Sequence, residues 1–192
     1  MKKSEKDYQR IVIKIGSSLI QAPEIIERLS EQIADLINHK REIILVSSGA
    51  IACGMGILGW KARPAKLSQL QAAASLGQSE LMELYRKRFS SYGIKCAQVL
   101  LTWEDFQERR RYLNAKHTLE ALLKLKSIPV INENDTVSVE EIKFGDNDRL
   151  SALVANLVDA DILIILSDVE GLLDPASNEV IRVVDNITSS IE

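Results

Sequence analysis

Five short apolar segments, separated by stretches with helical spacing, constrain the fold of this chain most strongly. Each segment is rich in Ile, Val and Leu and does not alternate with polar residues, which is typical of a strand buried on both faces of a sheet. We therefore predict five buried strands, at residues 11–15 (IVIKI), 42–46 (EIILV), 96–101 (CAQVLL), 128–131 (IPVI) and 162–166 (ILIIL).

The stretches between these segments carry apolar residues at the spacing of helices, as at Ile26, Leu29 and Ile33. Further helices are expected near residues 67–85, 113–125 and 148–160. Strands that alternate with helices predict an α/β fold of three layers, an α/β/α sandwich whose open, mainly parallel sheet has helices on both faces. Residues 136–144 (TVSVEEIKF) alternate apolar and polar side chains and predict a hairpin beside this sheet. With 192 residues, one domain over 1–192 is the expectation.

The overall charge argues against partners that need a strongly basic surface. Lys and Arg number 24 against 27 Asp and Glu, a net charge of −3, so we expect neither a nucleic acid nor a membrane as partner. No apolar run approaches the roughly 18 residues of a membrane span, and the start of the chain is too polar for a secretion signal. Cys53 and Cys96 lack metal-binding spacing and are interpreted as reduced thiols, which together predicts a cytoplasmic location.

Small and polar residues follow four of the five predicted strands. Ligands of open parallel sheets bind beyond the carboxyl ends of the strands, so these segments are the candidate site. Glycine and serine after a strand also let backbone N–H groups approach an anion. The segments are Gly16-Ser17-Ser18, Ser47-Ser48-Gly49-Ala50, Asn132-Glu133-Asn134-Asp135 and Ser167-Asp168, while the P-loop and G-x-G-x-x-G spacings are absent.

Lys14 is the single most informative residue, because it interrupts an otherwise apolar strand. A buried ammonium without a counter-charge is very costly. Two interpretations remain: the side chain extends along the sheet to reach water, or its ammonium lies at the strand end and binds a phosphate. We favour the second interpretation.

The segment 145–148 (GDND) places carboxylates and an amide directly before a predicted helix. Asn147 or Asp148 could cap this helix. The same groups could orient a catalytic lysine or hydrated magnesium, or bind a substrate, and spacing alone does not choose between these roles.

Several segments, taken together, resemble the amino-acid kinase superfamily and, within it, the glutamate 5-kinase family. The resemblance runs from about Ile11 to about Asp174, and its most specific part is NENDT followed by FGDND. The other matching segments are IVIKIGSSLI, ILVSSGAIACGMGILG, QAAASLGQSELMELY, QVLLTWEDF and ILIILSDVEGL. The resemblance implies transfer of a phosphoryl group from ATP to the γ-carboxylate of L-glutamate, which is the first step of proline biosynthesis. It also implies that Mg²⁺ is carried by the nucleotide phosphates and has no direct protein ligand.

The resemblance also implies residue roles. Lys14 would bind and stabilise the transferring phosphoryl group, and Asp148 would organise the catalytic lysines. ATP would contact Gly16 and Ser17, whose backbones offer donors, as well as Lys14, Ser167 and Asp168. Glutamate would contact Ser48, Gly49, Ala50, Asp135 and Asn147. A homo-oligomer and feedback inhibition by proline are further expectations.

The chain departs from the family pattern at its end, since no G-T-G-G-M-x-T-K segment is present. We therefore expect that part of the nucleotide-binding half is missing. The alternatives are a non-catalytic module that binds glutamate or proline, or assembles with other chains, and another member of the superfamily such as an acetylglutamate, uridylate or aspartate kinase.

Overall fold

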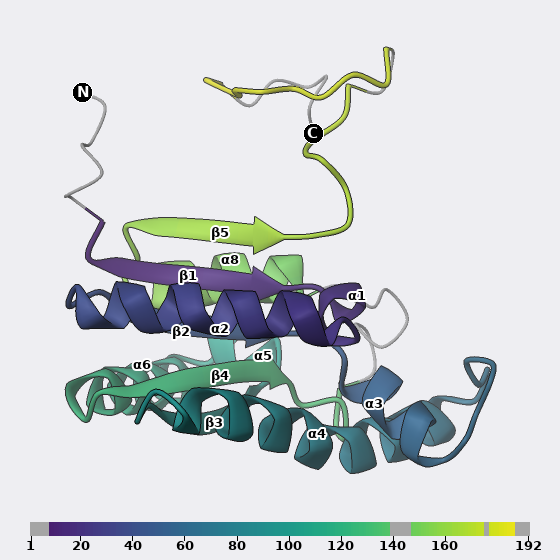
Figure 1. Ribbon diagram of the computed structural model, residues 1–192. Coiled ribbons are helices and arrows are strands. Elements are labelled where there is room, and N and C mark those ends of the chain that lie inside the picture. The colour runs from purple at the N-terminus through teal and green to yellow at the C-terminus, as the bar shows by residue number, and fades with distance from the viewer. Residues whose placement is uncertain (1–7, 139–146, 175–176, 187–192) are drawn as a thin grey trace.

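The computed structural model describes residues 8–138, 147–174 and 177–186, and a five-stranded parallel sheet lies at its centre (Figure 1). The strand order is β3-β4-β2-β1-β5, and every pair of neighbours is parallel. The strands are β1 (Arg10–Ile15), β2 (Glu42–Ser47), β3 (Lys95–Leu101), β4 (Ser127–Glu133) and β5 (Ile162–Leu166). The predicted α/β class is confirmed.

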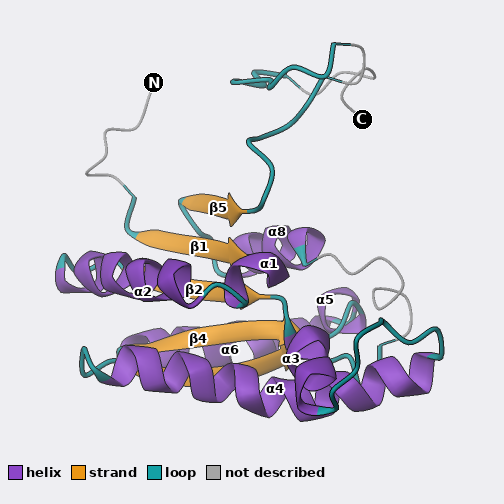
Figure 2. Ribbon diagram, turned by 45° about the vertical axis from the view of Figure 1, so that its right-hand side comes forward, coloured by secondary structure: helices purple, strands orange, loops and turns teal. Residues whose placement is uncertain are grey.

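Helices cover both faces of the sheet, so that the described chain has three layers (Figure 2). The longest helix is α4, and α1 and α5 are single turns. The helices are α1 (Ser17–Ile20), α2 (Pro23–Asn38), α3 (Ala50–Ile57), α4 (Leu67–Ser90), α5 (Glu104–Gln107), α6 (Arg109–Lys124) and α8 (Asp148–Leu157). None of the helices that the structure describes is long and apolar enough to cross a membrane.

Two hydrophobic cores lie on opposite faces of the sheet because successive side chains of a strand alternate between faces. Ile11, Ile13 and Ile15 of β1 pack into the core formed with α2 and α4. Val12 packs into the other core, with α6 and α8. Lys14 therefore has the parity of Val12, which directs it towards the face that α8 covers.

The two outer strands are more exposed than the sequence predicts. β1, β2 and β4 are buried almost throughout, whereas residues of β3 and β5 are mostly half-buried or exposed. The prediction of five fully buried strands is wrong for these two, because each pairs with a described strand on one side only. Composition did not reveal this, since β5 is as apolar as the central strands.

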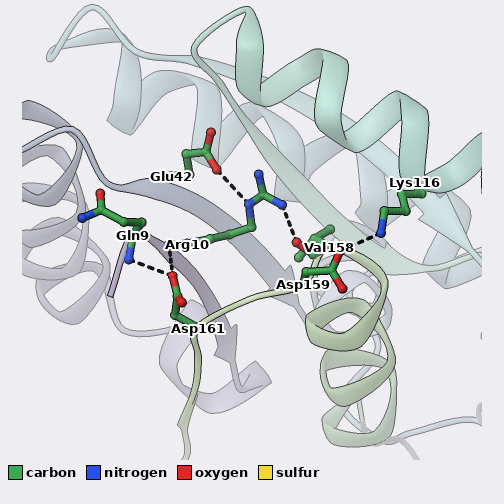
Figure 3. A network of polar contacts seen from close by, with 7 residues as sticks. All are labelled: Gln9, Arg10, Glu42, Lys116, Val158, Asp159 and Asp161. Atoms are coloured by element: carbon green, nitrogen blue, oxygen red, sulfur yellow. Dashed lines mark hydrogen bonds and ion pairs between the residues drawn. The ribbon is translucent and has the colours of Figure 1, made fainter. Parts of the chain in front are cut away.

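A polar network fixes the amino end of β1 between its neighbours (Figure 3). The Arg10 guanidinium contacts Glu42 of β2 at 2.7 Å and donates to the carbonyl of Val158, which follows α8. Asp161, just before β5, accepts hydrogen bonds from the backbone N–H groups of Gln9 and Arg10, both at 2.9 Å. These contacts hold β1 in register with β2 and β5, so the opposite ends of these strands are also aligned.

Two element boundaries differ from the expected ones. Helix α6 begins at Arg109 rather than near 113, because the Glu108 carboxylate accepts hydrogen bonds from the backbone N–H groups of Arg110 and Arg111 and caps the helix. The arginine cluster is thus the first turn of α6. Helix α8 ends at Leu157. Of the predicted hairpin at 136–144, residues 139–144 lie outside the described residues, and Thr136 and Val137 lie in a turn.

Candidate active site at the carboxyl ends of the strands

Hydrogen bonds between the strand ends bring the segments after β1, β2 and β5 together. The backbone N–H of Ser48 donates to the carbonyl of Ile15 at 3.0 Å, and the N–H of Gly16 donates to the carbonyl of Leu166 at 3.1 Å. Because the strands are parallel, their carboxyl ends meet at one edge of the sheet. The predicted site segments after these three strands therefore share that edge.

Lys14 and Asp148 form an ion pair at this edge. The Lys14 ammonium nitrogen lies 2.6 Å from Oδ1 of Asp148, with side-chain exposures of 8% and 41%. Asp148 is the first residue of α8, where the helix dipole also favours a negative charge. The Lys14 side chain is thus buried beside a carboxylate rather than extended into water.

Asn147 occupies the N-cap position of α8, but its side chain makes no capping hydrogen bond. Its Nδ2 instead donates to the backbone carbonyl of Ser47 and to Oδ1 of Asn132, both at 2.8 Å. The interpretation of the Asn147 side chain as a helix cap is therefore wrong. It links the start of α8 to the ends of β2 and β4.

Gly49 gives the segment after β2 a backbone shape that other residues rarely adopt. Its φ of 107° lies in the left-handed region, and it is the N-cap residue of α3. Ser48 precedes this turn, and the buried Ala50 begins α3. The helix then crosses α4 closely, since a Cβ on Gly77 would lie 1.8 Å from the carbonyl oxygen of Ala50. The Ser48-Gly49-Ala50 segment is thus held from behind by α4.

The segments after β1 and β5 have a different geometry from the one expected. The Gly16 N–H is already hydrogen-bonded to Leu166, so in this structure it is not available as a donor to a phosphate. A Cβ on Gly16 would lie 3.3 Å from the Leu166 carbonyl oxygen, which shows how closely these segments approach. Ser17 begins α1, and Ser167 donates to Asp168 at 3.2 Å, both side chains being exposed.

Asp135 lies in the turn that follows β4. The N–H of Asn134 donates to the carbonyl of Leu101 at 2.8 Å, which attaches this turn to the end of β3. A small cavity beside the turn is lined in part by Gln78, Asn134 and Asp135. Helix α4 therefore contributes to the surroundings of Asp135.

Sequence reasoning assigned no role to Trp103, Arg149 or Gln78, which the structure places around the site. The Arg149 guanidinium stacks over the Trp103 ring, 3.6 Å from its centroid, and joins α8 to the segment after β3. Gln78 Oε1 accepts a hydrogen bond from Asn132 Nδ2 at 2.9 Å. An arginine or a glutamine on a helix is common, so the sequence did not mark Arg149 or Gln78 as site residues. The polar Asn132 directly after the run IPVI did indicate that polar side chains gather at the end of that strand.

Burial shifts the pKa values of one tyrosine and two cysteines that pack in or against the core between the sheet and α4. Burial raises the pKa of Tyr85, whose hydroxyl lies 2.8 Å from Oγ of Ser47. Burial also raises the pKa of Cys96 to about 12 and raises the pKa of Cys53. Both cysteines are free thiols, and neither is suited to be a nucleophile.

The arrangement can bind an anion and stabilise negative charge. It offers an ammonium at a strand end, oriented by a carboxylate at a helix start, with polar groups of three further strand ends beside it. A buried lysine in this position fits the phosphate end of a nucleotide. Within the described ranges, no three His, Cys, Asp or Glu side chains cluster so as to hold a metal ion.

Comparison with known proteins assigns this α/β chain to a family. The model of the amino acid kinase family matches residues 9–190, and the chain belongs to this family. It is 53% identical to glutamate 5-kinase of Carboxydothermus hydrogenoformans over 187 residues, which cover 93% of this chain and 50% of that protein. It is 49% identical over 195 residues to glutamate 5-kinase of Moorella thermoacetica, covering 96% and 52%.

A third relative, glutamate 5-kinase of Caldanaerobacter subterraneus, is 56% identical over 171 residues, which cover 86% of this chain and 46% of that protein. The chain thus spans about half the length of the curated relatives it matches.

Proposed function

We propose that the protein to which this chain belongs transfers the γ-phosphoryl group of ATP to the γ-carboxylate of L-glutamate and forms L-glutamyl 5-phosphate. The observation that carries this proposal is the contact of the buried Lys14 with the half-buried Asp148, at the edge where the carboxyl ends of the parallel strands meet. Sequence identities of 53% and 56% to curated glutamate 5-kinases support glutamate as the phosphoryl acceptor. The reaction is the first step of proline biosynthesis.

Lys14 is the proposed catalytic residue. Phosphoryl transfer proceeds through a loose transition state whose charge spreads over the transferring oxygens, so positioning and charge neutralisation do most of the work. The Lys14 ammonium binds these oxygens while Asp148 holds it by a charge-assisted contact. Mg²⁺ on the nucleotide phosphates supplies further positive charge when bound.

The remaining residues bind the two substrates. Ser48, Gly49 and Ala50, held against α4, bind glutamate together with Asp135 and Asn147. The aspartate suits the α-ammonium group. Gly16, Ser17, Ser167 and Asp168 lie beside the nucleotide, with Gly16 acting through its lack of a side chain, since its N–H is occupied.

In this proposal residues 1–192 belong to a single amino-acid kinase domain, as the family match over residues 9–190 supports. The chain spans only about half the length of its relatives, which favours a second candidate function for the chain by itself. This function is that of a module that binds glutamate but does not turn over ATP. A cytoplasmic location, homo-oligomerisation and inhibition by proline belong to the same proposal.

The test is ADP release by the full-length protein with L-glutamate, L-aspartate or N-acetyl-L-glutamate as acceptor. The proposal predicts release that depends on L-glutamate and falls in the Lys14→Ala variant. ADP release that is indifferent to glutamate, or faster with either other acceptor, contradicts it. The purified 192-residue chain, assayed beside it with calorimetry for glutamate and for ATP, is expected to bind glutamate without turnover.

A further inference from the structure

The sheet is open at its amino edge, between β2 and β4. The ladder between these neighbouring strands begins only at Leu45, which pairs with Val130. The described residues before it, 42–44 of β2 and 127–129 of β4, do not pair with each other. Pro129, which has no N–H to donate, belongs to this part of β4. The two strands therefore diverge towards their amino ends.

A pocket of about 400 Å³ lies at this opening, and its volume is in the usual range for small-molecule sites. Apolar side chains from two helices and two strands line it, namely Ile37 of α2, Leu123 of α6, Ile43 of β2 and Ile128 of β4. Ile43 and Ile128 are each 2% exposed, so the pocket reaches the core. We call it the amino-end pocket, because the site around Lys14 lies towards the other ends of the strands.

Three lysines at helix ends line the amino-end pocket. Lys124 is the last residue of α6, and Lys40 and Lys126 follow the ends of α2 and α6. All three are exposed, and none forms an ion pair with another described residue. Glu42, the carboxylate of the described lining, contacts Arg10 at 2.7 Å instead (Figure 3). The pocket therefore carries positive charge that its own carboxylate does not balance.

Lys40 and Lys126 also have a backbone conformation that lysine rarely adopts. Their φ values are 64° and 55°, in the left-handed region where glycine or asparagine usually follows a helix. A side chain there costs free energy relative to glycine. Their N–H groups donate to the carbonyls of Ile37 and Leu123, at 2.8 and 2.9 Å, so these carbonyls are already hydrogen-bonded. Two helices on opposite faces of the sheet thus end with an unfavourable lysine beside one pocket, which indicates that the lysines bind a ligand.

We propose that the amino-end pocket binds an amphiphilic anion, a small molecule with an apolar body and a carboxylate, phosphate or sulfate group. The apolar body packs on the isoleucines and the leucine of the lining, where its burial is favourable. The anionic group contacts the ammonium groups of Lys40, Lys124 and Lys126. This site goes beyond the proposed kinase reaction, since it contains none of the residues assigned to glutamate or ATP.

Two fluorescent probes that differ by one charge test this site in the full-length protein. 8-Anilinonaphthalene-1-sulfonate is an amphiphilic anion, and N-phenyl-1-naphthylamine has the same rings without the sulfonate. The variant Lys40→Gly/Lys126→Gly removes two charges and suits the left-handed backbone. Ser127→Phe fills the pocket from a half-buried lining position. Lys87→Ala/Lys95→Ala removes two exposed lysines elsewhere and is the control for charge.

The proposal predicts one site for each probe, lost in Ser127→Phe. The glycine variant should weaken the sulfonate probe about tenfold at low salt and leave the neutral probe nearly unchanged, without lowering the midpoint of urea unfolding. The control variant should behave as the wild type. Three results would each overturn the proposal: no binding of the sulfonate probe, equal weakening of both probes by the glycine variant, or sulfonate binding that Ser127→Phe does not change.

Discussion

The ammonium of Lys14 in β1 lies 2.6 Å from the carboxylate of Asp148, the first residue of α8. The two residues are far apart in the sequence, and the parallel sheet brings them together because α8 covers the face towards which Lys14 is directed. Only 8% of the Lys14 side chain is exposed, so its charge acts where water screens it weakly.

In the full-length protein, Lys14→Ala should reduce kcat more than it raises the KM for glutamate. The interaction strengthens as charge develops on the transferring oxygens, so its loss is felt mainly in the transition state. Removing one such stabilising group costs roughly 10²- to 10³-fold in kcat. Steady-state kinetics measures both constants, with Lys87→Ala, which changes an exposed lysine on α4, as the control. An unchanged kcat in Lys14→Ala would show that Lys14 is not catalytic.

Ser48→Ala, Asp135→Ala and Asn147→Ala should each raise the glutamate requirement and leave ATP affinity nearly unaltered. Loss of a hydrogen bond to a charged group costs on the order of 1.5–3 kcal/mol, or roughly ten- to a hundredfold in binding. Glutamate and ATP titrations by calorimetry measure both affinities. If the affinity for ATP weakens in parallel, or if the variant loses much thermal stability, the substitution has impaired folding rather than glutamate recognition.

The sequence was sufficient to predict the strands and the site segments that follow them. The apolar runs located all five strands, and Lys14 was conspicuous because it is a charge inside one of them. Strand order was not predictable, because apolar composition carries no information on neighbours, and the exposure of β3 and β5 follows from that order.

The details of the site depended on tertiary contacts. Spacing alone left the role of Asn147 between a cap and a ligand, and the contacts with Ser47 and Asn132 decided against the cap. The use of the Gly16 N–H by Leu166 requires β1 and β5 to be neighbours, which local sequence does not encode. Gln78 was not identified because a glutamine on a long helix usually faces water.

Gly77→Ala should lower the free energy of unfolding by about 1–3 kcal/mol, whereas Gly56→Ala should leave it unchanged or raise it by up to about 1 kcal/mol. A Cβ at Gly77 would lie 1.8 Å from the Ala50 backbone oxygen, while nothing lies within 4 Å of a Cβ at Gly56. Both glycines are helical, so helix propensity is matched. Urea unfolding measures the difference, and equal effects would argue against the close crossing of α3 and α4.

Ile165→Lys should reduce self-association of the purified 192-residue chain. Ile165 is 46% exposed on β5, and no described strand pairs with the outer edge of β5. Such an apolar edge favours pairing between chains, and a lysine there opposes it. Sedimentation velocity of this variant tests the idea. The control variant is Leu125→Lys, which changes an exposed leucine after α6. A wild-type chain that remains monomeric contradicts the prediction.

Isotope transfer tests the central claim, that the site at the strand ends makes a γ-carboxylate attack a phosphoryl group. The full-length protein is supplied with ATP, L-glutamate labelled with ¹⁸O in its γ-carboxylate, and hydroxylamine. Hydroxylamine converts the acyl phosphate into a hydroxamate and releases inorganic phosphate, which keeps the bridging oxygen. The account predicts that this phosphate carries one ¹⁸O atom by ³¹P NMR, and that Lys14→Ala slows its formation by the same roughly 10²- to 10³-fold. Phosphate without label would mean that water attacks ATP, and would contradict the account.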